Sequence, residues 1–196
     1  APRSGRSPAW WVIPVTAAGG SERPREDGEA LRRLLRDAET RVDLPEASTW
    51  VKLNHNQQGY YRVFYEDPHA WERLGAAAAD GELSALDRQG LLADLAAFAW
   101  ASEDTAAGAA VDLHRFLEFA SRYYARESDP VVLGELAVKL TGFHSLLPEH
   151  RELRRTAFEL LRPHRDTVLG EPSDGKEPYA TSLLRDPVLS ALIAFE

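Results

Sequence analysis

The stretch SALDRQGLLADLAAFA, residues 84–99, decides the fold class. Ser84 and Asp87 form a pattern like a capping box, with Asp in place of the usual Glu, and this pattern marks the start of a helix. Apolar residues then recur at helical spacing, at Leu91, Leu92, Leu95, Phe98 and Ala99. The stretch therefore predicts a helix with one buried face.

Similar helical patterns surround this stretch. Asp67-Pro68 and Asp129-Pro130 are predicted helix starts, each with Asp as N-cap and Pro at the first helical position. Further apolar stripes comprise Leu113, Phe116, Leu117, Ala120 and Tyr124 in one segment, Leu133, Leu136, Ala137 and Leu140 in the next, and helices are expected at Glu149–Leu161 and Tyr179–Phe195. Breaks at intervals of roughly 20 residues are typical of stacked helical pairs. Residues 67–196 are therefore predicted to form an antiparallel α-α superhelix of the HEAT/ARM kind.

Residues 1–66 show strand patterns instead. Trp10–Thr16 is a short strand-like run, and Thr49–Tyr65 is the strongest strand signal. Leu53-Asn54 to Gly59-Tyr60 is a plausible hairpin, with Tyr60–Tyr65 as its second strand. A β segment this small is expected either to pack on the helices or to belong to a sheet with further strands.

The remaining parts of residues 1–66 carry weaker signals. Residues 1–9 are rich in Arg, Ser, Gly and Pro, and we expect them to be disordered. Ala17–Gly28 has a loop composition. The thin apolar stripe of Glu29–Thr40 permits a turn or two of helix.

Composition excludes several classes of protein. The chain has 196 residues, of which 44% are hydrophobic, and its formal net charge is 23 − 31 = −8. Nucleic acids and anionic membranes require a basic face, so neither is an expected partner. No apolar run reaches the length of a transmembrane helix, and Ala1–Pro8 lacks the apolar core of a signal peptide. The absence of cysteine is compatible with a reducing compartment, and we expect the protein in the cytoplasm.

Both ends suggest an excised piece of a longer protein. The chain has no methionine, so it does not begin at its own initiator. At the other end, the apolar run Leu189–Glu196 stops without a Gly, Asn or Pro to close a helix.

The sequence offers no catalytic constellation. Six histidines occur, none of them four residues from another as in a helical zinc site, at His55, His69, His114, His144, His150 and His164. The carboxylate pairs Glu103/Asp104 and Asp80/Glu82 are better explained as charges at helix N-termini. No catalytic or metal-binding residue is assigned, and the substrate-binding residues are unknown. A metal site assembled by the tertiary structure stays open at this point.

Aromatic residues form a second group, comprising Trp50, Tyr60, Tyr61, Phe64, Tyr65 and Trp71. We favour a core between the β and α parts, and the alternative is a peptide-binding wall of exposed tyrosine rings. Strand alternation would place Tyr60 and Arg62 on one face. Arg62 would then lie in solvent or pair with a carboxylate such as Asp87.

Several blocks resemble the M1 family of zinc aminopeptidases, most closely the puromycin-sensitive aminopeptidase type. They are WWVIPV at residues 10–15, WVKLN at 50–54, QGYYRV at 58–63 and LDRQGLLAD at 86–94, followed by Phe98-Ala99. The loop and helix around residues 169–189 also look similar. The order and spacing agree from about residue 10 to the end. Two features depart from the family pattern. They are Pro187 and the charged stretch Ser21–Thr40, which we interpret as an insertion.

The resemblance implies two partial domains. Residues 1–66 would be the end of the family's β-sandwich domain, and residues 67–196 the first part of its helical C-terminal domain. The zinc helix and the Gly-x-Met-Glu-Asn motif lie upstream in the family, so no catalytic residue is carried over. In such enzymes the helical domain covers the active site and limits access to it. The implied partners are the catalytic domain of the same parent protein, which would hold the zinc, and peptide substrates.

Three functions compete on this evidence. The first is the substrate-enclosing, regulatory C-terminal part of a zinc aminopeptidase. The second is a stand-alone, non-catalytic helical module that binds peptides or proteins. The third is an independent hydrolase that uses carboxylates, which an assay of the chain alone would test.

Overall fold

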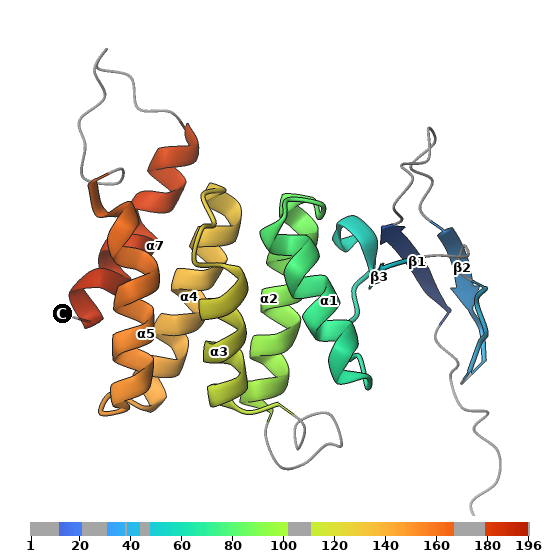
Figure 1. Cartoon of the computed structure of the whole chain (residues 1–196), viewed down its shortest axis with the longest axis horizontal. Coiled ribbons are helices and arrows are strands. Elements are labelled where there is room, and N and C mark those ends of the chain that lie inside the picture. Colours follow the sequence, from blue (N-terminus) through green and yellow to red (C-terminus); the bar gives the residue numbers. More distant parts are fainter. Residues whose placement is uncertain are drawn as a thin grey trace, which may run out of the picture. The chain divides into compact units, whose positions relative to one another are not determined.

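The computed structural model describes residues 12–20, 31–37, 39–43, 48–101, 111–166 and 179–195. Within these ranges the chain is mainly helical, and a small antiparallel sheet precedes the helices (Figure 1), which confirms the predicted fold class. The chain divides into two compact units, Ala1–Val63 and Phe64–Glu196. Residues 1–9, expected to be disordered, lie outside the described ranges. Membership of the sheet in a β-sandwich domain stays a prediction.

The first unit contains a sheet of three strands. They are β1 Ile13–Gly20, β2 Leu31–Leu35 and β3 Trp50–Leu53, in the spatial order β2-β1-β3. Both pairings are antiparallel. The predicted strand Trp10–Thr16 is confirmed from Ile13 onward. Val12 lies outside the strand, and Trp10 and Trp11 are not among the described residues.

β1 is longer than predicted. The strand continues to Gly20, so the prediction of a loop beginning at Ala17 is wrong for residues 17–20, while residues 21–28 lie outside the described ranges. Gly19 and Gly20 pair with Val51 and Trp50 of β3. A Cβ on Gly20 would come within 2.2 Å of the Trp50 indole nitrogen, so glycine permits this close approach.

The prediction of a helical turn within Glu29–Thr40 is also wrong for the described residues 31–37. Leu31–Leu35 forms β2, with Val15 opposite Arg33. A helix with a thin apolar stripe would bury little surface, whereas pairing with β1 satisfies the backbone groups whatever the side chains are. The charged loop expected over Ser21–Thr40 is therefore partly a strand.

The predicted hairpin between Leu53 and Tyr60 does not form. β3 ends at Leu53 and pairs with β1, and Tyr60–Tyr65 is not a strand. Asn54 has a φ of 54°, in the left-handed region, which turns the chain away from the strand direction. Its side chain accepts from the Gly59 N–H at 2.7 Å and donates to the Gly59 and Tyr61 carbonyls at 3.0 and 3.2 Å. These bonds replace the strand ladder that the pattern predicted.

The second unit consists of helices. The predicted starts at Asp67-Pro68, Ser84 and Asp129-Pro130 are confirmed, whereas the helix expected from Glu149 begins at Arg151. Their bounds are α1 Pro68–Ala79, α2 Ala85–Trp100, α3 Leu113–Tyr123, α4 Pro130–Leu146, α5 Arg151–Leu161 and α7 Tyr179–Phe195, with short 3-10 turns η1 His55–Gln57 in the first unit and η3 Arg162–His164 in the second. Asp67, Ser84 and Asp129 act as N-caps, accepting from the His69, Asp87 and Val131 N–H groups at 3.0, 3.2 and 2.9 Å. Pro187 lies inside α7.

These helices stack in two layers, α1-α3-α5 and α2-α4-α7, as Figure 1 shows. Neighbours within a layer are parallel, since the C-terminal ends of α2 and α4 meet at Trp100 and Phe143, with ring centroids 5.1 Å apart. His144 and Phe195 join the same ends of α4 and α7 at 5.0 Å. The predicted apolar stripes face the space between the layers, and Leu92, Phe116, Leu136 and Leu140 have no exposed surface. Leu113 and Phe98 are only half-buried.

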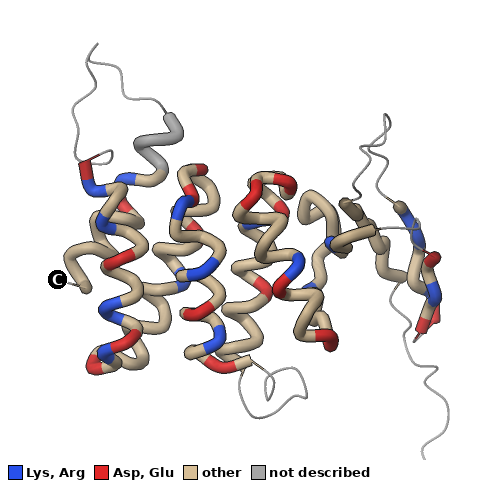
Figure 2. Tube along the Cα trace, in the orientation of Figure 1, with Lys and Arg blue, Asp and Glu red and all other residues tan. Residues whose placement is uncertain are grey.

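Charges of both signs alternate along the helices, and Figure 2 shows no helix of a single sign. This is the distribution expected of a solvated, mixed surface. Among the described residues, none of the helices combines the length and apolar character needed to cross a bilayer.

Replacing Asp129 by alanine is expected to lower the free energy of unfolding by about 1 kcal/mol, because two N–H groups at the start of α4 lose their acceptor. Urea unfolding followed by far-ultraviolet circular dichroism measures this change. Ser128→Ala, at the neighbouring exposed position, is the control and should change stability by less than about 0.5 kcal/mol. Equal losses in both variants would show that the Asp129 cap does not stabilise the helix.

Candidate functional site

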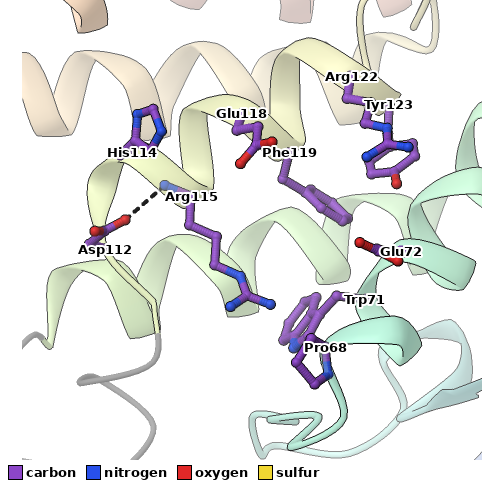
Figure 3. A pocket seen from close by; sticks show the side chains of 10 residues that line it. All are labelled: Pro68, Trp71, Glu72, Asp112, His114, Arg115, Glu118, Phe119, Arg122 and Tyr123. Atoms are coloured by element: carbon purple, nitrogen blue, oxygen red, sulfur yellow. Dashed lines mark hydrogen bonds between the residues drawn. The ribbon is translucent and has the colours of Figure 1, made fainter.

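A pocket of about 480 Å³ lies between α1 and α3. Figure 3 shows the side chains that line it, from Pro68, Trp71 and Glu72 on α1 and from Asp112 to Tyr123 on α3 and its N-cap. Positions 68, 71 and 72 share one face of α1, and positions 115, 118, 119 and 122 share one face of α3, because both sets recur at helical spacing. The pocket therefore follows from packing two parallel helices side by side.

Aromatic rings form the floor of this pocket. Trp71 and Phe119 meet edge to face with ring centroids 6.1 Å apart, and Phe119 meets Tyr123 at 4.9 Å. The Trp71 indole N–H donates to the Tyr65 carbonyl at 2.9 Å, which fixes the ring. A Cβ on Gly75 would lie 2.4 Å from the Tyr123 ring, so glycine at this position allows the ring to rest on α1.

Charged groups surround the aromatic floor. Glu72 and Glu118 are exposed, and the Arg122 guanidinium lies 5.2 Å from the centroid of the Tyr123 ring. Burial raises the pKa of the Tyr123 hydroxyl; Arg122 lowers this pKa, and Glu72 and Glu118 raise it further. Both carboxylates therefore act on the end of the pocket that Tyr123 occupies. In Figure 3, Arg115 extends toward Trp71 and Pro68.

Among the histidines, His114 lines this pocket, and His69 contacts Glu72, which also lines it. The imidazole Nδ1 of His114 is 2.9 Å from Glu152 of α5, and that of His69 is 3.1 Å from Glu72. Both contacts are exposed to solvent, where ion pairs contribute little to stability. The contact of His114 with Glu152 joins α3 to α5, and that of His69 with Glu72 lies within α1.

The other histidines are not gathered into a site. His150 caps α5 by accepting from the Leu153 N–H at 3.2 Å, and His144 packs on Phe195. His55 lies in η1 beside Asn56, and His164 lies in η3. In the part of the chain that the structure describes, no three His, Asp or Glu side chains are placed to hold a metal ion.

The carboxylate pairs considered from the sequence are not placed in a shared site by the described residues. Asp80 and Glu82 are exposed, and they lie after α1 instead of inside a helix N-terminus. Glu103 and Asp104 lie outside the described residues. Asp87 is buried, and its backbone N–H donates to the hydroxyl oxygen of Ser84, the N-cap of α2.

The predicted aromatic group divides between the two units. Tyr65 and Trp71 pack edge to face at 5.2 Å, and Phe64 packs on Phe98 at 5.3 Å, all within the helical unit. Tyr60, in the first unit, is fully exposed, with a relative accessibility of 110%. Exposure alternates as expected, with Tyr60 and Arg62 exposed and Val63 buried, although this segment is not a strand.

Sequence reasoning did not identify the α1/α3 pocket. Trp71 was assigned to the aromatic core, but Glu72, Arg115, Glu118 and Arg122 were not singled out. The sequence did contain a signal for the pocket, because these polar residues recur at helical spacing on the same helix faces as the neighbouring apolar residues. Only the pairing of α1 with α3 shows that the two faces meet.

Comparison with known proteins supplies independent findings. The family model of the ERAP1-like C-terminal domain matches residues 50–196. Aminopeptidase M1-B of Oryza sativa subsp. japonica is 28% identical over 203 residues, which cover 95% of this chain and 21% of the relative. Tricorn protease-interacting factor F2 of Thermoplasma acidophilum is 31% identical over 167 residues, covering 85% of this chain and 18% of the relative. The puromycin-sensitive aminopeptidase of Caenorhabditis elegans is 31% identical over 145 residues, covering 73% and 14%. The chain thus spans about a fifth or less of the length of these curated relatives.

Proposed function

The chain belongs to the ERAP1-like C-terminal domain family, and from this premise we propose that it is the substrate-enclosing, regulatory part of a zinc aminopeptidase of the M1 kind. The observation that carries the proposal is the family match over residues 50–196, which takes in β3 and every described helix. Several relatives are named as M1 aminopeptidases, which supports the peptidase context. The removal of N-terminal residues from peptides would then be the activity of the whole protein.

The helical unit is suited to the role of a cover. Its two layers share a continuous apolar core, and buried polar contacts such as the pair of Arg88 and Glu127 tie α2 to the segment after α3. A unit packed in this way is expected to move as a body, so that opening and closing would admit peptides and enclose them. Acidic and basic residues both occur along the helices (Figure 2), which is compatible with polar contacts to peptides.

We assign no chemical step to this chain. Its described residues do not offer a ligand set for zinc, so they do not fit that ion, and zinc is proposed to belong to another part of the protein. The proposed partners are that catalytic part and peptide substrates. A cytoplasmic site of action is part of the same proposal, which fractionation of cells expressing the tagged full-length protein tests.

Activity assays test the proposal. The chain alone is expected to release no N-terminal residue from peptides, with or without added zinc, because chemistry resides elsewhere in the protein. The full-length protein is expected to trim the same peptides and to lose this activity on chelation of its metal, because the metal would polarise the peptide bond and activate water. Chromatographic analysis of the released amino acids measures both.

Results opposite to these expectations would each refute a different part of the proposal. Zinc-dependent trimming by the chain alone would establish an independent hydrolase and refute the covering role. A full-length protein without any metal-dependent trimming would instead favour the alternative, a non-catalytic helical module that binds peptides or proteins. The purified chain must show the circular dichroism spectrum of a folded helical protein before the assay, so that inactivity is not a result of misfolding.

A further inference from the structure

We infer that the first turn of α5 is a pH-sensitive joint in the helical stack, held by the neutral imidazole of His150 and released when that imidazole takes up a proton. The inference goes beyond the proposed covering role, because it concerns how one helix of this chain is anchored and does not depend on catalysis elsewhere. Two contacts of this turn carry it, namely the His150 cap and the contact of Glu152 with His114.

The cap requires a neutral imidazole. His150 is the N-cap of α5, and its Nδ1 accepts from the Leu153 N–H at 3.2 Å. A ring nitrogen that accepts a hydrogen bond has no proton of its own, whereas an imidazolium carries protons on both nitrogens and can only donate. Protonation of His150 therefore removes the acceptor, and it also places a positive charge at the positive end of the helix dipole. Both effects weaken the first turn as the pH falls.

The other described N-caps lack this sensitivity. Asp67, Asp112 and Asp129 cap α1, α3 and α4 with carboxylates, and Ser84 caps α2 with a hydroxyl. Ordinary carboxyl groups change charge near pH 4 and a serine hydroxyl does not titrate, whereas imidazoles change charge between pH 5 and 8. Among the helix starts whose caps the structure describes, that of α5 is therefore the one expected to change its bonding in this range.

The second contact of the turn responds to protons in the opposite sense. Glu152, in the first turn of α5, lies 2.9 Å from the Nδ1 of His114 on α3. Protonation of His114 makes this contact an ion pair, which favours the approach of the turn to α3. The two side chains are 67% and 39% exposed, so the ion pair contributes little. The loss of the cap therefore decides the sign of the response.

Neighbouring charges do not replace the lost acceptor. The charged and titratable residues on the adjoining turns of the elements packed against this joint are Glu149, Arg151 and Arg154 beside the cap, Lys139 and His144 on the last two turns of α4, and Asp112 and Arg115 at the start of α3. Residues 187–195 of α7 contain no titratable side chain. Across the described ranges, no carboxylate lies within ion-pair distance of the His150 imidazole, so the charge created by protonation is not offset there.

Nuclear magnetic resonance titration of the isotopically labelled chain between pH 5 and 8 tests the inference. The Leu153 amide resonance is expected to move together with the ring resonances of His150. The protection of the Leu153 amide against hydrogen exchange, corrected for the intrinsic rate, is expected to be about 5-fold lower at pH 5 than at pH 8, as for the loss of one cap. The Asp87 amide, which donates to Ser84, is the internal control and should show neither change.

His150→Asn is the matched variant, because asparagine is a favoured N-cap and does not titrate. This variant is expected to keep the Leu153 amide protected at pH 5 and to lose the dependence on pH. His114→Gln removes the opposing ion pair and should leave the response of Leu153 in place, at equal or larger size. His150 is half-buried and His114 is exposed, so both variants are expected to fold, which their amide spectra verify.

Three results would overturn the inference. A Leu153 amide that does not respond between pH 5 and 8, or that responds equally in His150→Asn, would show that protonation of His150 does not release the turn. Loss of the response in His114→Gln would assign it to the other histidine. None of these outcomes bears on the proposed covering role, which the activity assays test separately.

Discussion

Replacing Arg88 by alanine is expected to lower the free energy of unfolding of the helical unit by about 3 to 5 kcal/mol. The Arg88 guanidinium holds both carboxylate oxygens of Glu127, with Nε at 2.7 Å and Nη2 at 3.1 Å. Only 15% of the Arg88 side chain and 7% of the Glu127 side chain are exposed. The variant would leave Glu127 buried without its counter-charge, and the Leu83 carbonyl would lose its donor at 2.7 Å.

The same pair predicts a dependence of stability on pH. Burial raises the pKa of Glu127, but the hydrogen bond from Arg88 and those from the Asp129 and Ser128 N–H groups outweigh burial, so the pKa lies below its usual value. A carboxyl with a lowered pKa in the folded state stabilises the protein above the unfolded pKa of about 4.3, and this contribution is lost as the pH falls through the folded value. The Arg88→Ala variant is therefore expected to lose less stability on acidification than the wild type.

Urea unfolding at several pH values, followed by far-ultraviolet circular dichroism, measures both effects. Arg73→Ala is the matched control, because Arg73 pairs with Asp67 at 3.0 Å but both side chains are about half exposed. An exposed pair of this kind contributes about 0 to 1 kcal/mol. Similar losses for Arg88→Ala and Arg73→Ala would contradict a stabilising role for burial of the Arg88 pair.

Replacing Leu136 by alanine is expected to cost about 2 to 5 kcal/mol of folding free energy. Leu136 has 0% exposed surface and lies on α4, which packs against α2, α5 and α7. Removal of its isobutyl group leaves a cavity that three neighbouring helices would have to move to fill. The loss should appear as a lower urea midpoint with an unchanged denaturant slope, if the unit still unfolds in one step.

Val138→Ala on the same helix is the control for this prediction. The Val138 side chain is 52% exposed, so its truncation should change stability by no more than about 0.5 kcal/mol. A large loss at Val138 together with a small loss at Leu136 would show that the assignment of the buried face of α4 is incorrect. Comparable small losses would show that the core around α4 is loosely packed.

The helices were predictable because each one carries its own local signals. Asp67, Ser84 and Asp129 mark starts through a side chain and an N–H group two or three residues away. The apolar stripes of α3 and α4 depend on helical spacing alone. Such signals lie within about four residues, so a single sequence contains all the information they need.

The sheet was predicted less well because strand pairing is not local. Trp50–Leu53 has β1 as its partner, 30 to 36 residues earlier in the chain, and not the neighbouring aromatic segment. The Asn54 side chain ends the strand by bonding Gly59 and Tyr61, and this contact is invisible in a hydrophobic pattern. The pattern at Leu31–Leu35 is too short to separate strand from helix.

The candidate site required the tertiary structure for the same reason. Glu72 and Glu118 are separated by more than forty positions, and they share a pocket only because α1 and α3 lie next to each other in one layer. The mutual contact of Trp71, Phe119 and Tyr123 has the same origin. The residue spacing within one helix indicates which of its residues share a face. It does not indicate which face of another helix lies opposite.

By itself, the sequence determined the mainly helical class, the starts of the helices, their buried faces and the likeness to M1 aminopeptidases. These properties arise from interactions between near neighbours and from ordered motifs along one chain. The tertiary structure alone decided the strand partners, the pairing of Arg88 with Glu127 and the pocket between α1 and α3. Those features join residues distant in sequence, and their free energy exists only once packing has brought both partners together.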